Sequence, residues 1–96
     1  MMSWYKLNCG DPLLSDPVVT GVIEAFEQYR RDGQIGTGAS IYSRHESRNS
    51  LHCELILYFT PETAPVARRV GARPCPVPRR RGLAPLAEAG ERQLPK

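Results

Sequence analysis

The clearest pattern of hydrophobic and polar positions in this chain is an alternation from Leu51 to Thr60. Its odd positions are leucine, cysteine or phenylalanine, whereas four of its five even positions carry a polar group. Because successive side chains of a strand point to opposite faces, the segment predicts a strand with one apolar and one more polar face. We expect Leu55 and Leu57 to form the centre of the core, with Cys53 shielded on the same face.

A second pattern, with apolar residues three and four positions apart, predicts an amphipathic helix after Asp16. A carboxylate accepts hydrogen bonds from free N–H groups and proline suits the first turn, so Asp16 followed by Pro17 is a helix-start signal. Two arginines followed by Gly33 predict the end of the helix. We expect the apolar stripe to pack across the strand, and its members are Val18, Val19, Val22, Ile23, Phe26 and Tyr29.

Two further segments predict strands. Residues 3–8 contain adjacent aromatic side chains, which favour extended structure, and residues 37–44 lead toward the main strand. The uniformly polar residues 45–50 separate the last two strands, as a hairpin loop does. If Ile41 and Leu55 share the core face, paired residue numbers in this hairpin sum to an even value near 96, the sum for that pair.

The C-terminal third begins with a predicted helix. Thr63 is a suitable cap, Pro65 lies within the first turn, and Gly71 ends the helix. Residues 73–82 combine three alternating prolines with a run of arginines and predict an extended, polyproline-like path. In residues 83–89, leucine and alanine predict one or two helical turns.

These elements predict an α+β fold, a small two-layer β-α-β-β-α domain with a short, mainly antiparallel sheet. We expect residues 1–71 to form the compact domain, with the helices largely on one face of the sheet. Residues 72–96 are a basic, proline-rich C-terminal segment, which either belongs to the same domain or is a partly ordered tail.

Charge is divided unevenly along the chain. Residues 67–96 contain eight Lys or Arg against two Asp or Glu, whereas residues 1–66 contain five against eight. The formal net charge of +3 therefore combines a basic end of +6 with an acidic body of −3. Such segregation is typical of a tail and a body with different functions.

Composition narrows the class of protein. With 41% hydrophobic and 24% charged residues the chain resembles an ordinary soluble protein, and its longest apolar run, residues 55–59, is too short for a membrane span. The N-terminal residues lack the apolar stretch of a secretory signal, and three widely spaced cysteines do not make a disulfide framework. We expect a cytoplasmic protein that does not associate with membranes.

Candidate catalytic groups are few. The sequence contains no Cys-x-x-Cys or His-x-x-x-His pair, so we expect neither a metal nor a cofactor. Cys75 lies between prolines and near Arg73 and Arg79, whose charges favour the reactive thiolate. Glu54 shares the polar strand face with His52. Since no oxyanion hole or sequence-adjacent base accompanies the thiol, catalysis is the least favoured of three alternatives.

The polar face of the sheet is the first candidate binding surface. If no helix covers this face, its aromatic and charged side chains form a dimer interface or stack RNA bases, and the absence of an aromatic-rich RNA motif favours the dimer. Parity assigns to it Tyr42, Arg44, His52, Glu54 and Tyr58.

The second candidate surface is an arginine cluster, consisting of Arg73, Arg79, Arg80 and Arg81. Arginines bind phosphates through bidentate hydrogen bonds and counterion release. The leading hypothesis from sequence is a non-enzymatic interaction module that self-associates through its sheet as a homodimer. The alternative is an accessory protein that binds nucleic acid or another polyanion through this cluster.

Overall fold

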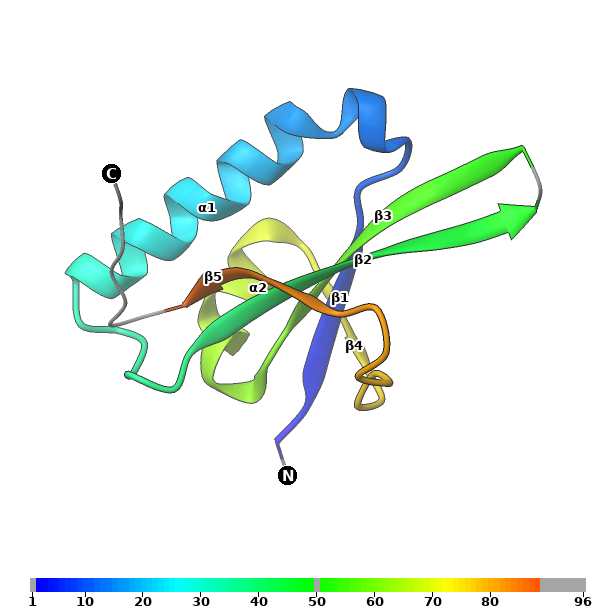
Figure 1. Ribbon diagram of the computed structural model, residues 1–96. Helices are drawn as coiled ribbons and strands as arrows, with labels where there is room; N and C mark the ends of the chain where they lie inside the picture. Colours follow the sequence, from blue (N-terminus) through cyan, green and yellow to red (C-terminus); the bar gives the residue numbers. More distant parts are fainter. Residues whose placement is uncertain (1, 50, 89–96) are drawn as a thin grey trace, which may run out of the picture.

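The computed structural model of the protein describes residues 2–49 and 51–88. Within these ranges two α-helices, two short 3₁₀ helices and five strands follow one another along the chain (Figure 1). Their bounds are β1 Trp4–Asn8, η1 Pro12–Leu14, α1 Asp16–Arg31, β2 Ser40–Asn49, β3 His52–Phe59, η2 Pro61–Thr63, α2 Ala64–Val70, β4 Arg73–Cys75 and β5 Ala84–Glu88. The strands form one antiparallel sheet in the order β4-β1-β3-β2-β5.

The core lies between this sheet and the layer formed by α1 and α2 (Figure 1). Leu55 and Leu57 are buried there, as the alternation predicted, and Phe26 of α1 packs in the same cluster. Ile23 belongs to the predicted stripe but is only half-buried. The buried apolar cluster consists of Val22, Phe26, Ala39, Ile41, Leu55, Leu57, Phe59, Val66 and Ala67.

The predicted α+β class and the element order β-α-β-β-α are confirmed, and two strands follow α2. β4 pairs with β1 at one edge of the sheet, and β5 pairs with β2 at the other. From β1 to β4, the order β-α-β-β-α-β is that of the split β-α-β motif of ferredoxin-like domains. The helical turns predicted after residue 82 were wrong, because β5 pairs with the open edge of β2 and Pro85 disfavours a helix there.

Helix α1 begins at Asp16, as predicted, and ends at Arg31, two residues before Gly33. The capping residue differs from the prediction, because Ser15 is the N-cap and its hydroxyl donates to the carbonyl of Pro12 (3.0 Å). Asp16 lies in the first turn, where its negative charge interacts favourably with the helix dipole.

Helix α2 begins after Thr63, as predicted, and this fully buried residue ties the helix to the sheet. Its hydroxyl lies 2.9 Å from the carbonyl oxygen of Thr60 and 3.2 Å from that of Ser40 in β2. Gly71 ends the helix with a φ of 84°, a left-handed conformation that favours glycine.

The hairpin of β2 and β3 has the predicted parity but a shorter loop. Ile41 lies opposite Phe59 and not Leu55, so from Ile41 to Ser47 paired residue numbers sum to 100, an even value that differs from 96 by a register shift of four residues. Residues 45–49, predicted as loop, continue β2, and the side-chain oxygen of Asn49 accepts the N–H groups of Leu51 and His52. The far end of this ribbon projects beyond the helix layer (Figure 1), so polar residues are tolerated on both of its faces.

The same projection explains why the prediction for Cys53 was wrong. Cys53 has the parity of the core residues, but it is exposed, and so is Leu51, which is 86% exposed. Strand parity determines the face on which a side chain lies, whereas burial also requires a helix above that face.

Candidate functional site

A connecting segment, residues 76–83, crosses the face of the sheet that is turned away from the helices. We call this segment the strap and this face the outer face. β4 and β5 lie at opposite edges of the sheet, so the chain between them must pass from one edge to the other (Figure 1). Ile56 and Tyr58, which point to the outer face by parity, are each only 5% exposed.

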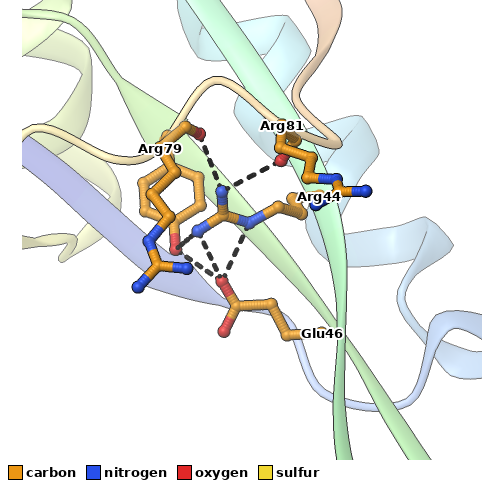
Figure 2. A network of polar contacts seen from close by, with 5 residues as sticks. Arg44, Glu46, Arg79 and Arg81 are labelled. Carbon is orange, nitrogen blue, oxygen red and sulfur yellow. Dashed lines mark hydrogen bonds and ion pairs between the residues drawn. The ribbon is translucent and has the colours of Figure 1, made fainter.

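Arg44 of β2 holds the strap to the sheet. Its Nη1 donates to the main-chain carbonyls of Arg79 (2.8 Å) and Arg81 (3.3 Å), as Figure 2 shows. Its Nε and Nη2 donate to a single carboxylate oxygen of Glu46 (3.1 and 3.0 Å). Nη2 also donates to the hydroxyl of Tyr58 (3.0 Å), which in turn donates to Glu46 (2.7 Å). All three nitrogens of the guanidinium are therefore engaged.

The network shifts the ionisation of its three members. Burial acts to lower the pKa of the Arg44 guanidinium, but hydrogen bonds to Glu46 and Tyr58 outweigh it and raise that pKa. The hydrogen bond from Tyr58 lowers the pKa of the Glu46 carboxyl, partial burial opposes this, and Arg44 lowers it further. Burial, then the hydrogen bond to Glu46, raises the pKa of the Tyr58 hydroxyl. The pair of Arg44 and Glu46 is therefore ionised over the physiological range of pH.

The strap turns the carbonyls of Arg79 and Arg81 toward the sheet and exposes its arginine side chains to solvent. Arg79, Arg80 and Arg81 are all exposed, and the side chains of Arg79 and Arg81 extend away from Arg44 to opposite sides (Figure 2). The turn that follows is closed by the N–H of Leu83 on the carbonyl of Arg80 (3.1 Å).

Glycine is required within this turn. Gly82 has a φ of 80°, and a Cβ atom there would lie 3.3 Å from Cδ of Arg44. Both the backbone conformation and the close approach of Arg44 therefore favour glycine.

Two more cations lie on the outer face, because Lys6 of β1 pairs in register with Tyr58 and Arg73 of β4 pairs with Lys6. Both residues are exposed. Like charges placed directly across an antiparallel pair are destabilising. Among the side chains that the structure describes, those of residues 2–49 and 51–87, no carboxylate lies within 4.0 Å of the charged groups of Lys6, Arg73 or the three strap arginines.

A shallow hollow of about 380 Å³ runs between the strap and the projecting part of β2. It opens beside two of the exposed arginines and is lined by Arg44, His45, Glu46, Ser47, Arg79 and Arg81. An anion in this hollow would meet the guanidinium groups of Arg79 and Arg81, and also the carboxylate of Glu46, whose charge Arg44 balances.

The predicted interface residues divide into two groups. Tyr42, Arg44 and Tyr58 come together at the centre of the outer face, where the guanidinium carbon of Arg44 lies 5.0 Å from the ring centroid of Tyr58. His52 and Glu54 lie further along the projecting hairpin. Glu54 is bound there by Asn8 (3.1 Å) and paired with Arg48 (3.6 Å).

The structure also brings the predicted arginine cluster together with residues that the sequence analysis missed. Arg73 lies in β4 at the sheet edge, and Arg79–Arg81 lie in the strap. Glu46 was assigned to a loop. Continuing the alternation of β2 for two residues beyond Arg44 would have placed Glu46 on the outer face. Lys6 carried no local signal, since its pairing with Arg73 spans most of the chain.

The expectation that neighbouring arginines lower the pKa of Cys75 was wrong. The thiol is half-buried, and burial raises its pKa more than the charge of Lys6 lowers it. Burial also raises the pKa of the Cys9 thiol. In the described part of the chain, no three Cys, His, Asp or Glu side chains gather as a metal site would require. Among the described helices, none combines the length and apolar character of a membrane span.

Comparison with protein-family models, with curated proteins and with solved structures gives no match for this chain. The function must therefore be argued from the geometry and charge of the outer face.

Proposed function

We propose that the protein is a non-enzymatic module that binds a polyanion on the outer face of its sheet. The observation that carries the proposal is the pair of hydrogen bonds from Arg44 to the carbonyls of Arg79 and Arg81. These bonds hold three consecutive exposed arginines in an ordered segment on the same side of the sheet as Lys6 and Arg73.

Pre-ordering makes this arrangement favourable for binding. Arginines on a free tail lose conformational freedom when they bind, whereas the backbone of the strap is already held by the sheet. The carboxylate of Glu46 is occupied by Arg44 and is not paired with the surrounding arginines. Their guanidinium groups therefore remain available for phosphate or sulfate groups. An anion would also relieve the repulsion between Lys6 and Arg73 across β1 and β4.

Retention on a heparin column across a salt gradient tests the proposal. The test variant changes Arg79, Arg80 and Arg81 to alanine, and the control changes Arg30, Arg31 and Arg69 of the helices to alanine. Both variants lose three positive charges, from the strap in one case and from the exposed surface of the helices in the other.

We expect the strap variant to elute from heparin at much lower salt than the parent. If binding to duplex DNA is measured as well, the slope of the logarithm of the binding constant against the logarithm of salt concentration should be flatter by up to about 3 units. The helix variant should elute close to the parent. Equal elution of the two variants would refute a localised site, and a parent that is not retained would refute polyanion binding.

Self-association is the second candidate function. The strap crosses the outer face on which the sequence predicted a homodimer, which leaves less of that face available to a second copy. A different surface supports association, because Leu13, Leu14 and Leu51 are 89%, 75% and 86% exposed. Leu13 and Leu51 line the same hollow between η1 and the hairpin.

Sedimentation over a range of concentrations tests this second function. A mass that rises with concentration in the parent, but not in a variant with Leu13→Ser and Leu51→Ser, would support a dimer through the leucines. A rise that both proteins share would support the sheet face or edge, and a constant monomeric mass would refute self-association.

We also infer a cytoplasmic location, which the free thiols of all three cysteines support.

A further inference from the structure

The outer face carries an aromatic pair beside its cations. Trp4 of β1 and Tyr42 of β2 stack across the strand between them, with ring centroids 6.2 Å apart and planes inclined by 26°. Both residues are half-buried, so part of each residue remains accessible to solvent. Neither has the parity of the core cluster, which places the pair on the same side as Arg44.

Cations flank this aromatic pair on two sides. Tyr42 precedes Arg44, which holds the strap, by two residues, a distance of about 7 Å along a strand. On the other side, Trp4 lies opposite Cys75 and therefore close to the cross-strand pair of Lys6 and Arg73. A chain that crosses the outer face from β4 to the strap would thus meet cations, then aromatic rings, then cations again.

Two acidic residues of this face, Glu46 and Glu54, are already engaged by other side chains. Glu46 is neutralised by Arg44 and hydrogen-bonded by Tyr58, and Glu54 is engaged by Arg48 and Asn8. The alternation of aromatic groups and unpaired cations matches a polymer that alternates planar bases with phosphates. In a duplex the faces of the bases are hidden in the stack, whereas in a single strand they can stack on aromatic side chains.

We propose that the polyanion is a single-stranded nucleic acid, whose bases stack on Trp4 and Tyr42 while its phosphates bind Lys6, Arg73 and the strap arginines. This inference rests on the proposed function, because it names the class of polymer that the same face binds. Stacking on an aromatic ring tolerates any base, so we expect little sequence preference.

The single tryptophan of the chain provides a direct test in the unmodified protein. Trp4 fluorescence is measured while a ten-nucleotide oligouridylate, inorganic polyphosphate of similar charge or a duplex of similar charge is added. Binding itself is followed separately, by competition against a fluorescently labelled oligouridylate. We expect all three polymers to compete, the oligouridylate most tightly, and only the oligouridylate to quench Trp4.

A pair of variants at the same position separates stacking from charge. Trp4→Leu removes the aromatic ring and should weaken oligouridylate binding by about 5- to 150-fold, the range measured for loss of one stacked base. Trp4→Phe keeps a ring and should bind nearly as the parent does. Polyphosphate binding should be the same in both variants, which also reports that they are folded.

The outcomes distinguish this inference from the proposed function. If oligouridylate and polyphosphate both bind but Trp4 fluorescence is unchanged, polyanion binding stands and the stacking of bases is overturned. Equal affinity for the duplex and the single strand would also overturn the inference. If none of the polymers binds, the proposed function itself fails.

Discussion

The guanidinium of Arg44 donates a hydrogen bond of 2.8 Å to the main-chain carbonyl of Arg79, thirty-five residues further along the chain. This contact joins the middle of β2 to the strap that connects the two outermost strands of the sheet. Because a planar guanidinium can donate in several directions at once, the same side chain also binds Glu46 and Tyr58. One residue therefore connects the stability of the outer face with the position of its arginines.

Replacing Arg44 by lysine should separate the shape of this side chain from its charge. We expect Arg44→Lys to lower the free energy of unfolding by about 1.5–3 kcal/mol, the range for hydrogen bonds to charged groups, because an ammonium cannot reproduce the fork. Arg48→Lys on the same strand is the control, since Arg48 is 67% exposed and only weakly paired. Denaturant unfolding measures both, and equal losses would show that Arg44 does not hold the strap.

The centre of the core should be sensitive to the loss of a single side chain. Leu57 is 0% exposed in the central strand β3, so Leu57→Ala should cost about 2–5 kcal/mol. Leu51→Ala makes the same change where the side chain is 86% exposed, and it should shift stability by less than about 0.5 kcal/mol. Thermal melts of the two variants beside the parent would contradict the packing if they overlay.

Stability should decrease at acidic pH partly because of Glu46. The folded protein holds the pKa of this carboxyl below its usual value of 4.5, so the unfolded state takes up the proton more readily. The contribution of Glu46 is therefore complete above the unfolded pKa and is lost as pH falls through the folded pKa.

Glu46→Gln should accordingly be less stable than the parent at neutral pH and should lose less stability between about pH 5 and pH 2. Glu62→Gln, at an exposed position outside the network, controls for the change in net charge. Chemical denaturation at a series of pH values measures the effect. Parallel curves for the parent and Glu46→Gln would show that the carboxylate adds nothing to the fold.

The three thiols should differ in their rates of alkylation. Cys53 is exposed, whereas Cys9 and Cys75 are half-buried and burial raises the pKa of both thiols. Since the thiolate is the reactive form, Cys53 should be labelled first under native conditions. Timed alkylation followed by peptide mapping gives the order, and early labelling of Cys75 would indicate that the strap or β4 opens readily.

Local periodicity was sufficient to predict several elements of this fold. The start of α1 at Asp16, the end of α2 at Gly71 and the core positions of Leu55 and Leu57 were all predicted correctly. Each depends on contacts between residues close in sequence or on which face of one element is apolar. Such information is present in a short stretch of chain.

Other parts of the sheet were decided by partners distant in sequence. The polar residues after Arg44 resemble a loop, but β3 pairs with them and extends the hairpin, which leaves Cys53 beyond the helix layer and exposed. Similarly, the residues of β5 resemble a weak helix until the open edge of β2 supplies backbone partners. Strand pairing depends on an available edge, and no local sequence pattern contains that information.

The arginine cluster and part of the outer face were predicted from the sequence, whereas Lys6, Glu46 and the assembly of the site required the tertiary structure. Three consecutive arginines among prolines are visible in the chain, and so is the aromatic and charged parity of the strands. Only the placement of β4 and β5 at opposite edges sends the strap across the outer face, where Arg44 binds its carbonyls and Lys6 lies opposite Arg73. A strand order is set by the packing of the whole domain, because every strand competes for the same few edges.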